Sequence, residues 1–331
     1  MRKLLLSILG LLTPAILLAQ AVTYPTHFTV AQDGSGDFKT IQEAVNAVRD
    51  LSQVQVSIYI KKGIYREKLV IPSWKTRISL IGEDRENTII TNNDFSGKAN
   101  PQGKDAFGKD KFTTYTSYTV LVQGNDFIAQ NLTIENAAGP VGQAVALHVE
   151  ADRCAIINCR LLGNQDTLYA GTENSRQFYK DCYIEGTTDF IFGEATAVFQ
   201  HCELKNLKNS FITAPATTQR QQFGFVFFDC RLLAVDSVKK VFLGRPWRPY
   251  AKVVFINTDI ASPVFAAGWD NWRNPENEKT AFFAEYKSTG KGAVTSDRVS
   301  WSHQLTEAEI KKYTIKNILS GTDNWDVLSI K

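Results

Sequence analysis

Two aspartates recur at a spacing that could build an acid/base pair. Asp166 and Asp189 are 23 residues apart, and each follows a cysteine, Cys159 or Cys182, by seven residues. If the segments around them are successive coils of one repeat, the two carboxyl groups lie one above the other, about 5 Å apart in backbone. Repulsion between like charges then raises one pKa, which leaves one acid and one base in the same site. Such a pair suits general acid/base work or nucleophilic catalysis by a carboxylate.

Two glutamines precede these aspartates at nearly the same spacing. Gln165 is next to Asp166, and Gln143 lies 22 residues before Gln165. Their side-chain amides can donate hydrogen bonds to a developing oxyanion. A ladder of amides with aspartates capping turns is the structural alternative, and for any one residue alone it would be preferred. The four residues together, at spacing matched to the repeat, favour catalysis.

The segment FLGRPWRPY adds a cation and an aromatic ring. Arg245 can hold one aspartate ionised through a charge-assisted bond, and Trp247 offers a flat apolar face to a sugar ring. A packed surface corner explains an Arg-Pro-Trp turn equally well. The spacing of the repeat does not itself place Arg245 beside Asp189.

A repeat of short β-rich segments must position these groups. A polar residue followed by a small or apolar one recurs at intervals of 20 to 28 residues, at Asn131, Asn158, Asp181, His201, Asp229 and Asn257. A period in the twenties, with many strands and few helices, is typical of stacked coils. The sequence therefore predicts an all-β, single-domain parallel β-helix.

The five cysteines all lie between Cys154 and Cys230. Four of them occupy the same place in the repeat, which predicts a ladder of small side chains inside the solenoid. Adjacent coils also bring Cα atoms within disulfide range, so a Cys182–Cys202 bond is possible. The odd number leaves at least one thiol unpaired.

Two short helices are expected outside the repeat. Ile41, Ala44, Val45 and Val48 have the spacing of one helical face, and Thr40 with Glu43 fits a capping box before them. In the tail, Thr306 and Glu309 have the same relation at the start of a second predicted helix. We expect this helix to pack over the last coil or along one side.

The first 21 residues have the features of a secretory signal peptide. Arg2 and Lys3 precede an apolar run over 4–18, and Ala19-Gln20-Ala21 supplies small residues for cleavage after Ala21. The run is short for a membrane anchor, is interrupted by Pro14, and has no second apolar segment after it. We therefore expect residues 1–21 to be removed, a mature domain over 22–331, and a secreted or periplasmic protein.

Composition and charge exclude some functions. The 331 residues are 44% hydrophobic and 21% charged, as in a globular protein. Without Arg2 and Lys3, 35 basic residues face 34 acidic ones, a net charge of about +1. No basic stripe interleaved with aromatics is present, so a nucleic-acid partner is not expected.

Five motifs in order resemble the signatures of pectin methylesterases, the pectinesterase family. They are GIYRE (63–67), QAVAL (143–147), GNQDTLY (163–169), TDFIFG (188–193) and LGRPW (243–247), and they span nearly the whole mature chain. GIYRE is weak alone, whereas GNQDTL followed by DFIFG and LGRPW is highly specific. The resemblance implies a right-handed parallel β-helix that acts on methyl-esterified pectin. It also implies that no metal or organic cofactor is needed, and we expect a monomer.

The same resemblance assigns a role to each matching residue. Asp189 corresponds to the nucleophile, Asp166 to the general acid/base, and Arg245 to the residue that orients Asp189. Gln143 and Gln165 correspond to the groups that stabilise the oxyanion. The aromatic residues expected to line the sugar-binding cleft are Tyr169, Phe192 and Trp247.

Other functions remain open at this stage. A pectate lyase would need a calcium-binding carboxylate cluster with a basic residue, and a polygalacturonase would need aspartates with water between them; neither signature is present. A non-catalytic carbohydrate-binding solenoid would not need both aspartates, Gln143 and Arg245 together. A related esterase or thioesterase acting on another ester is not excluded.

Overall fold

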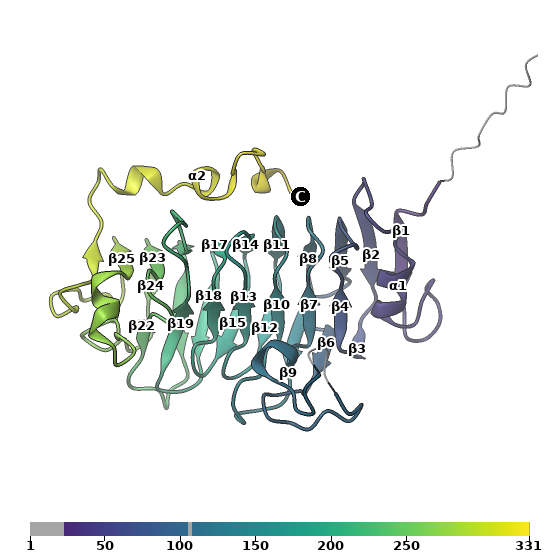
Figure 1. Cartoon of the computed structure of the whole chain (residues 1–331), viewed down its shortest axis with the longest axis horizontal. Helices are drawn as coiled ribbons and strands as arrows, with labels where there is room; N and C mark the ends of the chain where they lie inside the picture. Colours follow the sequence, from purple (N-terminus) through teal and green to yellow (C-terminus); the bar gives the residue numbers. More distant parts are fainter. Residues whose placement is uncertain (1–22, 105–107, 331) are drawn as a thin grey trace, which may run out of the picture.

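The chain winds into a solenoid whose wall consists of three parallel β-sheets (Figure 1). The structure is a computed structural model that describes residues 23–104 and 108–330. Each complete coil of the solenoid contributes one strand to each sheet in turn, whereas the coils at the ends contribute fewer, and neighbouring strands in a sheet come from successive coils. The predicted parallel β-helix is confirmed, and its crossovers have the right-handed sense that parallel connections adopt.

The first sheet, which we call sheet A, has eleven strands. They are β1 (His27–Val30), β2 (Val56–Ile60), β5 (Ile78–Gly82), β8 (Ile128–Gln130), β11 (Cys154–Ile157), β14 (Arg176–Lys180), β17 (Thr196–Gln200), β20 (Phe225–Phe228), β23 (Lys252–Ile256), β25 (Phe282–Tyr286) and β26 (His303–Gln304).

Sheets B and C complete the wall. Sheet B contains β3 (Gly63–Arg66), β6 (Thr88–Asn92), β9 (Thr133–Asn136), β12 (Arg160–Leu162), β15 (Tyr183–Gly186), β18 (Glu203–Asn206), β21 (Arg231–Ala234) and β24 (Asp259–Ile260). Sheet C contains β4 (Leu69–Ile71), β7 (Val120–Val122), β10 (Leu147–Val149), β13 (Leu168–Ala170), β16 (Ile191–Gly193), β19 (Phe211–Pro215) and β22 (Phe242–Gly244).

The polar residue of the repeat makes the corner between sheets A and B. All six such residues have left-handed backbone angles, with φ between 48° and 57°: Asn131, Asn158, Asp181, His201, Asp229 and Asn257. Asparagine and aspartate tolerate this region better than most residues, which explains their recurrence. The residue after each corner points inward and is at most 2% exposed, as at Cys159 and Thr258. Each repeated residue pair therefore consists of a corner residue followed by a residue that points into the solenoid.

The cysteines form the predicted interior ladder, but the possible disulfide is wrong. All five are buried free thiols, including Cys182 and Cys202. The Cys182 thiol instead donates to backbone carbonyls of Ile156 and Lys180, at 3.3 Å each. Burial raises the pKa of both thiols well above the ordinary value, which keeps them protonated.

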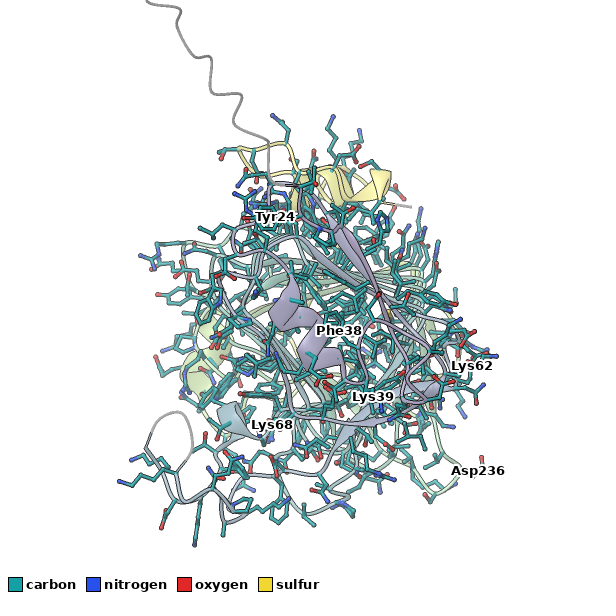
Figure 2. All side chains as sticks on the ribbon, turned by 90° about the vertical axis from the view of Figure 1, so that its right-hand side faces the viewer. Tyr24, Phe38, Lys39, Lys62, Lys68 and Asp236 are labelled. Atoms are coloured by element: carbon teal, nitrogen blue, oxygen red, sulfur yellow. The ribbon has the colours of Figure 1, made fainter. Side chains whose placement is uncertain are left out.

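Helix α1 (Ile41–Ala47) closes the N-terminal end of the solenoid (Figures 1 and 2). The predicted capping box is present: the Thr40 hydroxyl accepts from Glu43 N–H, and the Glu43 carboxylate accepts from Thr40 N–H. Ile41, Ala44 and Val45 are fully buried and cover the first coil. The apolar face read from the sequence is thus the one that packs.

The prediction for the tail was partly wrong. Thr306 and Glu309 do bond reciprocally, but only the 3₁₀ turn η3 (Ile310–Lys312) follows them. The α-helix of the tail is α2 (Ile315–Leu319), whose N-terminus is capped by the Thr314 hydroxyl. The other 3₁₀ turns are η1 (Thr114–Thr116), η2 (Pro275–Lys279) and η4 (Val327–Ser329).

The C-terminal segment runs back along the outer face of sheet A, as the yellow part of Figure 1 shows. Ile318 and Leu319 of α2 pack in an apolar layer with Val198 and Val226 of the sheet. Asp323 anchors the segment through Arg176, with Nη1–Oδ1 at 2.6 Å. The segment covers sheet A, and the outer face of sheet C remains for a binding site.

Two predictions for the N-terminus lie outside what the structure describes. Residues 1–21, the expected signal peptide, are not among the described residues. Within the described ranges, no helix is long and apolar enough to cross a membrane. The domain boundary at residue 22 therefore stays a prediction.

A stack of aromatic rings inside the solenoid should contribute strongly to stability. Phe227 is fully buried between Phe199 and Phe255, with ring centroids 4.4 Å away on each side. We expect Phe227→Ala to lower the free energy of unfolding by about 3–5 kcal/mol, because the cavity opens in a close-packed interior. Phe265→Ala is the control, since its ring is 42% exposed. Chemical denaturation that gave the two variants equal stability would contradict this packing.

Candidate active site

The two aspartates lie on adjacent strands at the same level of their coils. In sheet C, Leu168 of β13 pairs with Ile191 of β16, and each aspartate stands two residues before one of these partners. Asp166 and Asp189 are therefore one strand spacing apart in the backbone, about 4.8 Å. Both have left-handed backbone angles, φ 66° and 48°, in the turn that enters sheet C.

Arg245 holds Asp189 in a two-point ion pair. The Nε of Arg245 donates to Oδ1 of Asp189 at 3.0 Å, and its Nη2 donates to Oδ2 at 2.6 Å. The guanidinium also lies between two aromatic rings, 3.9 Å from the Phe211 centroid and 3.7 Å from that of Trp272. The ion pair and the stacking together fix the orientation of the Asp189 carboxylate.

The environments of the two carboxyl groups differ. Burial, followed by the charge of Asp189, raises the pKa of Asp166 well above its ordinary value. Burial also raises the pKa of Asp189, but the hydrogen bonds and charge of Arg245 oppose that rise. Asp166 is therefore the carboxyl group that retains a proton, and Asp189 is the one that ionises first.

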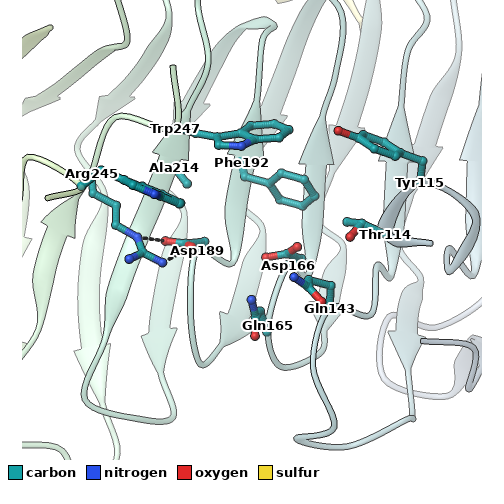
Figure 3. A pocket seen from close by; sticks show the side chains of 11 residues that line it. Thr114, Tyr115, Gln143, Gln165, Asp166, Asp189, Phe192, Ala214, Arg245 and Trp247 are labelled. Carbon is teal, nitrogen blue, oxygen red and sulfur yellow. Dashed lines mark hydrogen bonds and ion pairs between the residues drawn. The ribbon is translucent and has the colours of Figure 1, made fainter. Parts of the chain in front are cut away.

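The glutamines complete the polar part of the site (Figure 3). Gln143 and Gln165 pair across adjacent coils in an isolated parallel bridge, and both line the same cleft as the aspartates. The cleft has a volume of about 180 Å³. The structure thus brings together all five polar residues singled out in the sequence, including Arg245, which the repeat spacing alone did not place.

Aromatic side chains form the rest of the cleft. Phe192 and Trp247 line it, with an edge-to-face contact at 5.8 Å. Tyr169 is not among the residues that line this hollow but lies next to two of them, Phe192 and Tyr115, so its place in a longer sugar-binding cleft stays a prediction. Its ring stacks behind Phe192 at 4.7 Å, and its hydroxyl donates to Glu194 at 3.0 Å. Tyr169 supports Phe192 because it lies on the neighbouring coil of the same column.

Four lining residues were not anticipated: Thr114, Tyr115, Ala214 and Trp272. Tyr115 belongs to the turn η1, and Trp272 lies in the loop after β24. Both are aromatic residues in loops outside the repeat. Aromatic residues at such positions could have been proposed from the sequence as lining the cleft. Ala214 carries no signal of its own, because its place follows only from pairing with Phe192 across β16 and β19.

Removing the ring of Trp247 should weaken catalysis without unfolding the protein. We expect Trp247→Ala to lower kcat/KM, because the transition state loses about 1–3 kcal/mol of stabilisation, the scale of one large aromatic contact. Trp74→Ala is a matched control, because this 53% exposed tryptophan is not part of the cleft lining. Steady-state kinetics showing equal kcat/KM for the two variants would mean that Trp247 is only a packed corner.

The fold and the site together define a parallel β-helix protein with a buried carboxylate pair in an aromatic cleft. The model of the Pectinesterase family matches residues 27–322. This chain belongs to the pectinesterase family.

Individual relatives agree with this assignment. Pectinesterase 31 from Arabidopsis thaliana is 41% identical over 283 residues, which cover 85% of this chain and 88% of the relative. A probable pectinesterase/pectinesterase inhibitor 21 from the same plant is 40% identical over 89% of this chain, which spans only 44% of that longer relative.

Solved structures have the same fold. Pectin methylesterase from carrot has a TM-score of 0.82 and 35% identity, over 92% of this chain and 96% of the carrot chain. A pectin methylesterase crystallised in complex with a hexasaccharide has a TM-score of 0.75 and 31% identity, over 92% of this chain and 99% of its own.

Proposed function

We propose that this protein hydrolyses the methyl esters of homogalacturonan, giving demethylated pectin and methanol. The observation that carries the proposal is the pairing of an Arg245-bound Asp189 with an Asp166 that has a raised pKa, in one cleft. Family membership and the similarity to pectin methylesterases, one of them bound to a hexasaccharide, support the same substrate.

Asp189 is the proposed nucleophile. Its carboxylate attacks the carbonyl carbon of the methyl ester and forms a tetrahedral intermediate. Each oxygen keeps a lone pair while it accepts from Arg245, so the ion pair orients the group without blocking attack. The amides of Gln143 and Gln165 are the proposed donors to the oxyanion.

Asp166 is the proposed acid and then the base. When the intermediate collapses, the bond to methoxide breaks and Asp166 supplies the proton that makes methanol. The polymer is then joined to Asp189 as an acyl-enzyme. The ionised Asp166 next removes a proton from water, which attacks the acyl carbonyl and releases the polymer carboxylate and Asp189. The raised pKa of Asp166 suits both proton transfers.

Three products measured in one digest test this function. Highly methylated pectin should release methanol, with no unsaturated ends by ultraviolet absorbance and no new reducing ends. Unsaturated ends or shortened chains without methanol would assign the protein to a lyase or a glycosidase.

Chelation by EDTA should leave the rate of methanol release unchanged, because amides and a carboxylic acid supply the electrophilic assistance.

We also propose that the protein acts outside the cytoplasm, after cleavage near Ala21. The basic and apolar start of the chain supports export, and so does a substrate too large to cross a membrane. The intact mass of the exported protein, with Val22 as its first residue, tests this. A monomer remains our expectation, which sedimentation can check.

A further inference from the structure

Asp270 lies one strand step beyond Arg245 at the edge of sheet C. The segment after β24 pairs with the end of β22: Gly244 and Trp269 form a parallel bridge, and the N–H of Asp270 donates to the Gly244 carbonyl at 3.1 Å. The next residues after this bridge are Arg245 and Asp270, so their backbones are neighbours at about 4.8 Å. A third aspartate therefore belongs to the surroundings of the arginine that holds Asp189.

Asp270 also fixes the turn that carries Trp272. Its Oδ1 accepts a hydrogen bond from the N–H of Trp272 at 2.7 Å, the pattern by which an aspartate stabilises a turn two residues further on. Trp272 and Arg273 both have left-handed backbone angles, φ 61° and 56°, which are unfavourable for side chains of this size. Such a turn persists only where contacts hold it, and the bond to Asp270 is one of these contacts.

The turn brings the ring of Trp272 against Arg245. The guanidinium carbon lies 3.7 Å from the centroid of this ring and 3.9 Å from that of Phe211, and Trp272 also lines the cleft. Without the bond to Asp270, Trp272 would be free to leave the guanidinium. The orientation of Arg245, and with it that of the Asp189 carboxylate, therefore depends on Asp270.

The charge of Asp270 acts on Asp189 as well. In the described part of the chain, Arg245 forms its ion pair with Asp189, and Asp270 acts from beyond ion-pair distance. Burial raises the pKa of Asp189, the hydrogen bonds and charge of Arg245 lower it, and the charge of Asp270 raises it again. Asp166 on the adjacent coil is the other titratable group beside Asp189. The groups that set the ionisation of Asp189 are thus Arg245, Asp166 and Asp270.

Asp189 needs both a fixed orientation and enough basicity to attack an ester. Arg245 supplies the orientation, but its charge also stabilises the ionised carboxylate and so makes it less basic. A less basic carboxylate is a weaker nucleophile, so the ion pair alone would slow the attack. The negative charge of Asp270 offsets part of this loss, because Coulomb interactions are stronger in a partly buried site than in water.

We propose that Asp270 is a positioning residue of the active site: it holds Trp272 against Arg245, and its negative charge offsets the hold of Arg245 on the nucleophile. This inference rests on the proposed esterase function. Because the hydrogen bond and the charge can be removed separately, the two contributions have different effects on catalysis.

Two substitutions separate the contributions. Asp270→Asn removes the charge and keeps a side-chain oxygen that can accept from the N–H of Trp272, whereas Asp270→Ala removes both. Asp33→Asn is the matched control, because Oδ1 of this exposed aspartate also accepts from the N–H two residues on, that of Ser35, at 2.9 Å, and Asp33 is not part of the cleft lining. Methanol release from methyl-esterified galacturonan fragments is measured for each variant across the acid and neutral range, together with thermal melts.

The value of kcat/KM should fall on the acid side as Asp189 takes up a proton. Removal of a nearby negative charge favours the ionised carboxylate, so we expect this acid limb to move to lower pH in Asp270→Asn, by about half a pH unit. The plateau should stay within about threefold of the parent, because basicity affects the rate only in part. Asp270→Ala should show the same shift and a plateau about tenfold lower, the effect of one lost hydrogen bond. Asp33→Asn should match the parent in both respects.

An acid limb of Asp270→Asn at the same pH as that of the parent would overturn the inference, and so would equal plateaus for Asp270→Asn and Asp270→Ala. Either result would leave the esterase function intact, since methanol is still released. A parent protein that released no methanol would overturn the esterase function and the inference with it. If Asp270→Ala melts early, the acid limb of Asp270→Asn, which keeps the turn, decides the inference.

Discussion

Replacing Asp189 by alanine should abolish methanol release and leave the solenoid folded. The change removes the nucleophile, so only direct attack of water on the ester remains. We expect kcat to fall about 10⁴-fold or more, which corresponds to about 5 kcal/mol or more in activation free energy. Many coils share the stability of the fold, so loss of one side chain on the outer face of a sheet, outside the apolar interior, does not unfold it. Methanol assays with thermal melts measure both effects.

A second aspartate in the same backbone conformation provides the control. Asp181 has a φ of 54°, close to the 48° of Asp189, but it lies at a corner of the repeat away from the cleft. Asp181→Ala therefore costs the same backbone strain and should keep full activity. Asp189→Asn checks that the loss does not come from an Arg245 left without its partner. Activity of Asp189→Asn within tenfold of the parent would exclude Asp189 as the nucleophile.

Replacing Asp166 by alanine should give the second largest loss, with a different pattern. Without Asp166, Asp189 still attacks, but no acid protonates the departing methoxide and no base activates water. Esters with a better leaving alcohol do not need the acid, so an activated aryl ester should show a rapid burst of alcohol in Asp166→Ala, about one per enzyme. Asp189→Ala should show no such burst. A burst in Asp189→Ala instead would mean that the two roles are reversed.

The raised pKa of Asp166 also predicts how stability changes with pH. A carboxyl group whose pKa is higher in the folded protein stabilises the fold below its unfolded pKa, 3.8, and this stability is lost as pH rises through the folded pKa. Asp166→Asn cannot ionise and should therefore unfold at a higher temperature than the parent at neutral pH. The difference should shrink as the pH approaches the acid range. A variant less stable than the parent at neutral pH would contradict the pKa shift.

The sequence could predict the parts of the fold that follow from local rules. The corner residues Asn158 and Asp181 mark the period because few other residues tolerate left-handed angles there. Equal spacing after Cys159 and Cys182 then places Asp166 and Asp189 on adjacent coils, as the register of β13 and β16 has it.

Features that depend on the irregular loops were harder to predict from the sequence. Arg245 follows two coils of unequal length, so counting residues did not bring it to Asp189, and only the family resemblance did. Tyr169 was expected in the cleft only from the family resemblance; in the structure its ring stacks on that of Phe192 and its hydroxyl bonds to Glu194. The α-helix of the tail begins after Thr314 rather than at Thr306, because its apolar partners on sheet A lie over Ile318 and Leu319.

The acyl-enzyme on Asp189 can be tested by competition between water and an added nucleophile. Hydroxylamine is added to digests of methyl and aryl esters of galacturonan fragments, and the ratio of hydroxamate to free acid is measured for each ester. If both esters form the same acyl-Asp189 intermediate, the ratio is identical for both. The alcohol has already left before water or hydroxylamine attacks the intermediate. A ratio that differs between the two esters would show that water attacks the ester directly and that Asp189 is not the nucleophile.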